Sequence, residues 1–99
     1  MSRILSKKVR ILLQKTREPI CYICGKDVVF PYLITSNGGE IIEYRSGYVK
    51  YSLENKIYYG IAYTIDHKLP KSKGGTNSLD NLEICCGFCN EEKGNDYYN

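Results

Sequence analysis

The sequence predicts a small α+β domain that a metal ion holds together. Three observations predict it: an amphipathic helical pattern near the N-terminus, runs rich in Val, Ile and Tyr between residues 28 and 65, and two C-x-x-C pairs far apart in the chain. A chain of 99 residues has a large surface relative to its core, so domains of this length often need a metal ion or disulfides to be stable. We expect a single domain, with a basic amphipathic N-terminal helix in residues 1–20 and the main body in residues 21–99.

The N-terminal helix is predicted from Arg3 to Arg17, and Pro19 ends it because Pro excludes Glu18 from helical geometry. Residues 1–20 carry six Lys and Arg against one acidic residue, which suits a polyanionic partner. A solvated helix face or a mitochondrial targeting segment also fits this composition. One expected stripe, which docks on the body, comprises Leu5, Val9, Leu12 and Leu13, and the other, which faces solvent or phosphates, comprises Arg3, Lys7, Arg10, Gln14 and Arg17.

Residues 28–65 favour an antiparallel hairpin or meander of short strands, broken at residues 36–39, 45–47 and 53–55. Packing is the expected role for most of the tyrosines in this region, with stacking on nucleic acid as the alternative. Residues 71–78 form a predicted loop and residues 81–84 a short strand. A short helix follows over residues 87–93, with Gly94 as its C-terminal stop. The tyrosines of residues 28–65 are Tyr32, Tyr44, Tyr48, Tyr51, Tyr58, Tyr59 and Tyr63.

The two C-x-x-C pairs have the spacing at which two thiolates from one turn reach the same tetrahedral ion. Two such pairs make a closed structural zinc site, which contributes directly to folding. Disulfides are the weaker interpretation because the cysteine count is odd and the N-terminus has no secretory apolar run. A rubredoxin-like iron centre is a competing class. The expected zinc ligands are Cys21, Cys24, Cys86 and Cys89, with Cys85 as a buried apolar filler.

Three segments carry a family resemblance: CYIC at 21–24, IDHKLPKSKGGTNSLDNL at 65–82 and CGFCNEEKG at 86–94. With these segments the chain resembles the HNH endonucleases of the His-Me finger group, whose ββα-metal motif consists of two strands and a helix. The first and last motif positions here are Asp66 and Asn90 in place of histidine, and both keep an oxygen that can bind a metal. The resemblance implies a C-terminal ββα-metal motif and an enzyme that hydrolyses phosphodiester bonds.

By this resemblance, Asp66 and Asn90 hold one divalent ion, His67 is the general base, and Asn81 orients the histidine loop. Carboxylate and amide oxygens suit Mg²⁺ or Mn²⁺. The resemblance also implies products that carry 5′-phosphate and 3′-hydroxyl ends. The rival is a non-catalytic zinc module that binds nucleic acid or protein. The basic residues assigned to phosphates are Arg3, Lys7, Arg10, Lys71, Lys73 and Lys93.

The expected partner is nucleic acid, taken as DNA, with RNA left open. No run approaches the roughly 20 apolar residues that a membrane span needs, so we expect a cytoplasmic, non-secreted protein without membrane association. One active site per chain cuts one strand, so a double-strand break requires a dimer or two binding events. We therefore expect a monomer or a weak homodimer.

Overall fold

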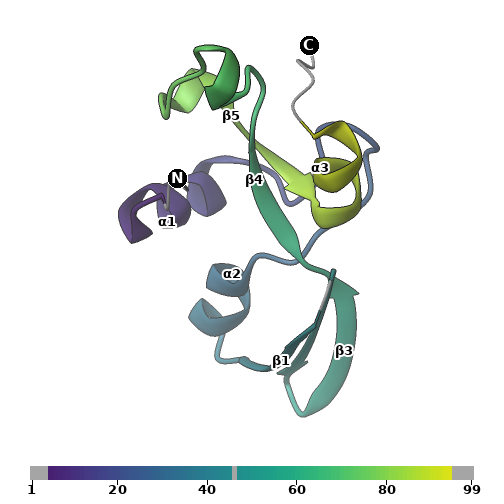
Figure 1. The fold of residues 1–99 in the computed structure, drawn as a ribbon. Coiled ribbons are helices and arrows are strands. Elements are labelled where there is room, and N and C mark those ends of the chain that lie inside the picture. Colours follow the sequence, from purple (N-terminus) through teal and green to yellow (C-terminus); the bar gives the residue numbers. More distant parts are fainter. Residues whose placement is uncertain (1–4, 46, 95–99) are drawn as a thin grey trace.

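A computed structural model of the protein describes residues 5–45 and 47–94, and it confirms the small α+β architecture (Figure 1). The three-stranded sheet has the order β1-β2-β3, and a second sheet pairs β4 with β5; both are antiparallel. No helix in the described part of the chain is long and apolar enough to cross a membrane. The elements in chain order are α1 (Lys7–Thr16), α2 (Pro31–Ser36), β1 (Glu40–Arg45), β2 (Tyr48–Leu53), β3 (Lys56–Ile61), β4 (Tyr63–His67), the 3₁₀ helices η1 (Lys71–Lys73) and η2 (Leu79–Asn81), β5 (Leu82–Cys86) and α3 (Gly87–Lys93).

Helix α1 begins later than the sequence predicts. Ser6 is its N-cap, and the Ser6 hydroxyl accepts a hydrogen bond from the Val9 amide at 3.2 Å. A capping serine has extended backbone angles, so Leu5 and Ser6 precede the helix instead of belonging to it. Arg3 lies outside the described residues. The helix ends before Pro19, as predicted.

The two predicted stripes of α1 are partly wrong. Leu12, expected to dock on the body, is 40% exposed, whereas Gln14, expected to face solvent, is buried. Gln14 lies inside because its amide bridges two elements: Nε2 donates to the Tyr63 hydroxyl at 3.1 Å, and Oε1 accepts from the Tyr32 amide at 2.9 Å. A polar side chain with these partners can be buried at little cost, and it turns the docking face of α1 toward β4 and α2.

The first strand expected between residues 28 and 36 is instead the short helix α2. Pro31 occupies its first turn, where the missing N–H needs no partner and the fixed φ angle is already helical. Gly38 follows the helix with a φ of +85°. The segment before α2 makes two isolated bridges, an antiparallel one between Ile20 and Asp27 and a parallel one between Val29 and Ala62.

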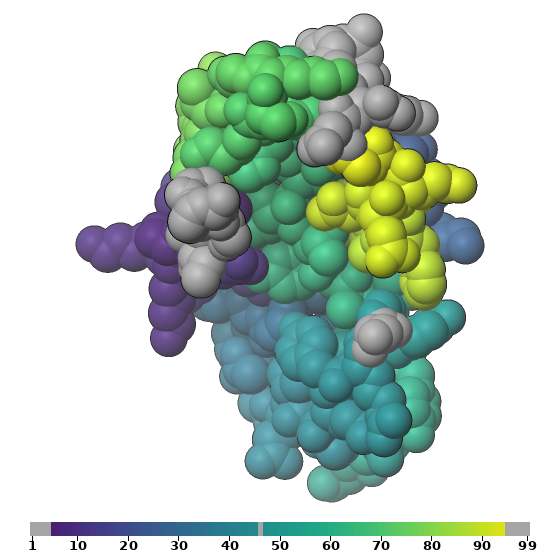
Figure 2. Space-filling model, viewed as in Figure 1, coloured from purple at the N-terminus to yellow at the C-terminus, as the bar shows by residue number. Residues whose placement is uncertain are grey.

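The predicted meander is confirmed in β1, β2 and β3. The turn between β2 and β3 has Glu54 and Asn55 at positive φ, as two-residue hairpin turns require. Tyr51 and Tyr58 stack across this hairpin with ring centroids 5.3 Å apart, so packing is the role of this tyrosine pair. The molecule measures 45 × 25 × 24 Å, and the meander occupies the end of it that is opposite the loop after His67 (Figure 2).

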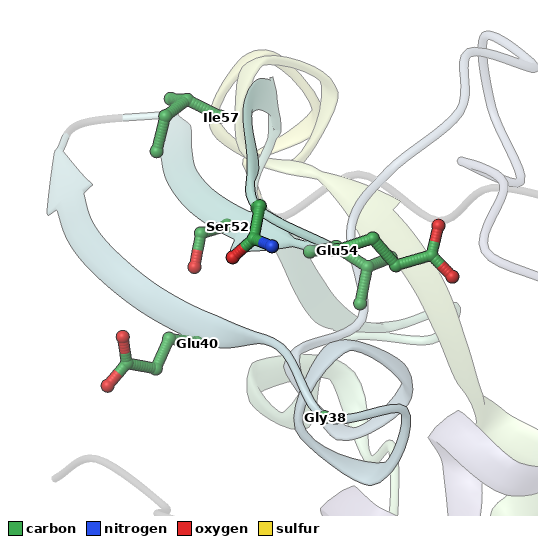
Figure 3. Close-up of a pocket in the computed structure, with 7 residues that line it drawn as sticks. Gly38, Glu40, Ser52, Glu54 and Ile57 are labelled. Atoms are coloured by element: carbon green, nitrogen blue, oxygen red, sulfur yellow. The ribbon is translucent and has the colours of Figure 1, made fainter.

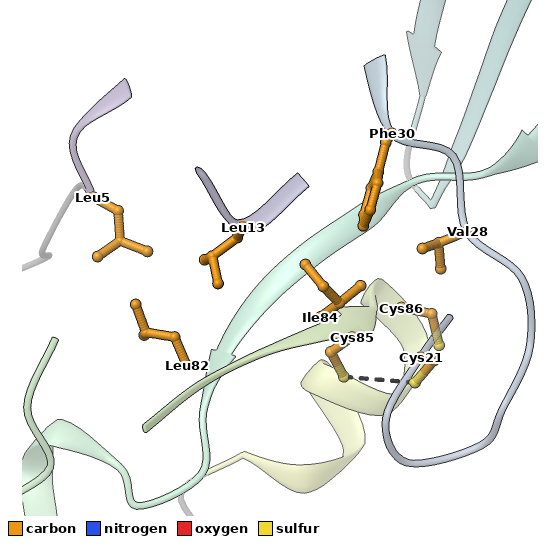
Figure 4. Close-up of a cluster of buried hydrophobic side chains, with 9 residues drawn as sticks. All are labelled: Leu5, Leu13, Cys21, Val28, Phe30, Leu82, Ile84, Cys85 and Cys86. Atoms are coloured by element: carbon orange, nitrogen blue, oxygen red, sulfur yellow. Dashed lines mark hydrogen bonds between the residues drawn. The ribbon is translucent and has the colours of Figure 1, made fainter. Parts of the chain in front are cut away.

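The core lies between α1 and the β4–β5 pair. Helix α3 follows β5 directly, spans the residues that the sequence predicts, and ends at Gly94. It packs against both β4 and β5, on the opposite side of the pair from α1 (Figure 1). This strand pair and helix therefore place the ends of β4 and α3 beside each other. The buried apolar cluster comprises Leu5, Leu13, Cys21, Val28, Phe30, Leu82, Ile84, Cys85 and Cys86 (Figure 4).

Candidate metal and nuclease site

Four cysteines come together where the segment before α2 meets the start of α3. The Sγ atoms of Cys21, Cys24, Cys86 and Cys89, the four-cysteine cluster, all lie within 4.8 Å of one another. A tetrahedral zinc with Zn–S distances of about 2.3 Å separates its sulfur atoms by about 3.8 Å, and Cys24 and Cys86 are already 3.9 Å apart. The cluster is thus positioned to hold a metal ion, and its donor set is consistent with zinc.

The pKa values of the thiols do not separate the cluster from Cys85, because burial also raises the pKa of Cys89, a member of the cluster. Burial would raise the pKa of Cys21, but backbone hydrogen bonds from Cys24, Cys86 and Ile23 bring it down to about 6. Cys85 lies outside the cluster, and burial raises its pKa, as does the neighbouring Cys21. Its Sγ lies 3.9 Å from that of Cys21 in the apolar core (Figure 4). Cys85 therefore suits the role of a protonated core residue that the sequence predicts.

The Asp66 carboxylate is buried near the end of β4 and is held from two sides. The Tyr22 hydroxyl donates to Oδ2 at 2.6 Å. The Lys93 ammonium lies 3.4 Å from Oδ1 and 3.3 Å from Oδ2. Burial and the hydrogen bond to Asp66 both raise the pKa of Tyr22, so the phenol keeps the proton that it donates.

Lys93 points into the domain. Its side chain is 2% exposed, and its ammonium also donates to the His67 carbonyl at 3.0 Å. Lys93 thus joins the end of α3 to the last two residues of β4. Contact with a phosphate, the role expected from the sequence, requires this ammonium to leave Asp66.

His67 is the last residue of β4, and its ring is held by the loop that follows. Nε2 lies 2.7 Å from Oδ1 of Asn77. A carbonyl oxygen can only accept, so this contact places a proton on Nε2, and in the neutral ring the lone pair is then on Nδ1. The Asn77 side chain therefore supports the tautomer in which Nδ1 can take a proton.

The Asn81 side chain holds the loop after His67 through three hydrogen bonds. Its Oδ1 accepts from the Leu69 amide at 2.8 Å, and its Nδ2 donates to the carbonyls of Leu69 at 3.0 Å and Thr76 at 2.9 Å. One side chain thus closes residues 69–76 into a fixed loop directly after His67. This geometry suits the loop-orienting role that the resemblance implies for Asn81.

Asn90 and Asp66 lie on the same side of β4, toward α3. The Thr64 hydroxyl donates to the Cys85 carbonyl at 2.9 Å, so it accepts the bond from Asn90 Nδ2 at 3.0 Å. Because Nδ2 is committed to Thr64, the Oδ1 atom of Asn90 is the one that can bind a cation. A carboxylate and an amide oxygen fit Mg²⁺ or Mn²⁺, and Asp66 retains acceptor capacity beyond Tyr22 and Lys93.

The basic residues that the sequence assigns to solvent or phosphates differ in their exposure and their hydrogen bonds. Lys7, Lys71 and Lys73 are exposed and Arg10 is half-buried. Arg17, expected to face solvent or phosphates, instead donates to the carbonyls of Leu82 at 2.8 Å and Leu79 at 2.9 Å and to the Glu83 carboxylate at 3.0 Å. Arg17 therefore anchors the end of α1 to the segment that carries Asn81.

The sequence alone did not indicate three residues that lie at the site: Tyr22, Thr64 and Asn77. Tyr22 stands inside the first C-x-x-C pair, and Thr64 lies two residues before Asp66, on the same face of the strand. That spacing is the one signal that could have indicated Thr64. Nothing local distinguishes Tyr22 or Asn77 from other polar residues, because their partners are distant in the chain or lie across a loop.

Two of the surface hollows that the described residues line differ in their position relative to the site. A cavity of about 370 Å³ lies under the histidine loop, lined in part by Lys68, Gly75 and Asn81. A larger one of about 550 Å³ opens between β1 and the β2–β3 turn, beside Glu40 and Glu54 (Figure 3). Two acidic residues there do not suit a phosphate backbone, so the larger hollow is not the place for nucleic acid.

A family model matches the part of the chain that carries the site. The family model described as HNH endonuclease matches residues 53–96, which run from the end of β2 through α3 and include Asp66, His67 and Asn90. Searches of the curated proteins and of the solved structures find no match to the chain.

Proposed function

Because the HNH endonuclease family model matches residues 53–96, which suggests a nuclease-type function, we propose that this protein is a metal-dependent endonuclease. It hydrolyses phosphodiester bonds of nucleic acid, with DNA as the proposed substrate. The observation that carries the proposal is the arrangement around β4 and α3. Asp66 and His67 end one strand, the helix brings Asn90 to the side of Asp66, and the loop bonded to Asn81 holds the base.

In this proposal His67 acts as the general base. Its Nδ1 atom takes a proton from the attacking water, while Asn77 keeps the ring in that tautomer. Oxygens of Asp66 and Asn90 would hold one Mg²⁺ or Mn²⁺, which supplies stabilisation of the charge that builds on the phosphate and the leaving oxygen. The exposed Lys71 and Lys73 contact flanking phosphates, and the products carry 5′-phosphate and 3′-hydroxyl ends.

A non-catalytic zinc module remains the second candidate, and one observation favours it. The Asp66 carboxylate faces the Lys93 ammonium instead of an open surface. A pure binding domain needs no base at the end of β4, which is why we prefer the nuclease.

A plasmid-cleavage assay distinguishes the nuclease from the non-catalytic zinc module. His67→Ala should cut supercoiled plasmid at least about 10²-fold more slowly than wild type, and no concentration of Mn²⁺ should restore it, since an ion cannot replace a proton acceptor. Asp66→Asn keeps the shape of the side chain beside the buried Lys93, and its cleavage should partly return at high Mn²⁺. Glu91→Ala, an exposed acid next to Asn90 on α3, is the matched control and should cut normally.

Zinc content and nucleic-acid binding should be unchanged in all three variants. If His67→Ala cuts at the wild-type rate, the nuclease proposal fails and the zinc module becomes the better account.

A further inference from the structure

The side chains that hold Asp66 come from both halves of the four-cysteine cluster. Tyr22 stands between Cys21 and Cys24, and Lys93 ends the helix that contains Cys89. Their contacts converge on one carboxylate: the Tyr22 hydroxyl on Oδ2 at 2.6 Å, and the Lys93 ammonium within 3.4 Å of both oxygens. A metal that joins the two halves therefore also sets the distance between the two groups that hold Asp66.

The backbone of Tyr22 is fixed independently of Asp66. Its amide donates to the Ile84 carbonyl at 2.9 Å, and Ile84 on β5 pairs with Ile65, the residue before Asp66. Tyr22 thus approaches the carboxylate from a backbone anchored to the strand beside β4. A phenol carried by such a backbone can fix the rotation of the carboxylate, because it bonds only one of the two oxygens.

We propose that Tyr22 is a positioning residue, which couples the four-cysteine cluster to the Asp66 carboxylate and orients it for the divalent ion. The inference rests on the proposed function, in which Asp66 is a ligand of that ion. The Lys93 ammonium already lies within 3.4 Å of both carboxylate oxygens, so without the phenol this ammonium alone sets the rotation of the carboxylate. The ammonium then competes with the divalent ion for the lone pairs that the ion needs.

Loss of a hydrogen bond to a metal-ligating carboxylate typically costs 10–100-fold in metal affinity or activity. We expect Tyr22→Phe to raise the Mn²⁺ dissociation constant by about 10-fold or more. The effect should be one of affinity: the Mn²⁺ concentration for half-maximal cleavage rises, while the rate at saturating Mn²⁺ approaches that of wild type. A role confined to folding would not produce this split.

Tyr63→Phe is the matched control. It also removes one part-buried phenol hydrogen bond, the one from Gln14, and the Tyr63 side chain lies on the opposite face of β4 from Asp66, three residues further along the strand. The zinc-loaded full-length proteins are titrated with Mn²⁺, and free Mn²⁺ is followed by its electron paramagnetic resonance signal, which reports binding without cleavage. Zinc content is measured on the same samples and should stay at one per chain.

The outcomes separate the two proposals. Weaker Mn²⁺ binding in Tyr22→Phe with unchanged binding in Tyr63→Phe supports the inference. Equal binding by wild type and Tyr22→Phe, or equal weakening in both tyrosine variants, overturns the inference and leaves the nuclease proposal intact. If wild type binds no Mn²⁺, or if Asp66→Ala, which has no side-chain oxygen, binds it as well as wild type does, Asp66 is not a ligand and both proposals fail.

Discussion

Replacing Gly75 by alanine should disable the histidine loop while leaving the fold in place. A Cβ atom on Gly75 would lie 1.7 Å from the Leu69 carbonyl oxygen, 2.7 Å from the Leu69 carbonyl carbon and 2.9 Å from the Pro70 oxygen. All three are backbone atoms, so no flexible side chain can move aside. To reach even 3.0 Å from the Leu69 oxygen, the backbone must shift by at least about 1.3 Å.

That shift would displace the hydrogen bonds from Asn81 that hold the loop. Asn81 bonds the Leu69 amide at 2.8 Å and the Leu69 carbonyl at 3.0 Å, two residues after His67. A misplacement of about 1 Å can cost roughly 10²-fold in rate. We therefore expect Gly75→Ala to cut plasmid about 10²-fold more slowly than wild type at saturating Mn²⁺.

Zinc content and the cooperativity of thermal unfolding should be retained in this variant, because the four cysteines lie outside the loop. Gly87→Ala is the matched control: its nearest neighbour would be Thr64 Cγ2 at 3.9 Å, an ordinary contact, and its rate should match wild type. Wild-type cleavage by Gly75→Ala would refute the argument that the loop geometry positions the base.

Two further predictions concern the metal and the basic helix. Cys86→Ser should lose the zinc, whereas Cys85→Ser should keep one zinc per chain, because of these two neighbours Cys86 alone belongs to the four-cysteine cluster. Elemental analysis measures the zinc, and the opposite result would mean that the ligand is misassigned. Changing Arg3, Lys7 and Arg10 to Gln should weaken nucleic-acid binding and lower the slope of log affinity against log salt by up to about 0.9 per lost phosphate contact. An unchanged slope would show that this helix face is merely solvated.

Short-range patterns predicted the four-cysteine cluster and the later turns better than they predicted the first part of the chain. The C-x-x-C spacings, the stop at Gly94 and the turn at residues 53–55 are each set by a few neighbouring residues, and each agrees with the structure. The strand expected before residue 36 was wrong because a run of apolar residues does not distinguish a strand from a short helix, and Pro31 favours the helix start.

The sequence by itself determined which groups could do chemistry: four thiols at ligand spacing, one histidine, and the oxygens of Asp66 and Asn90 on either side of a Gly-rich loop. Tertiary structure decided how those groups are held. The partners of Asp66 come from 44 residues before it and 27 residues after it. Gln14 is buried because Tyr32 and Tyr63 reach it from other elements. Residue type and spacing are local properties of a chain, whereas a hydrogen bond to a distant partner exists only after the elements have packed.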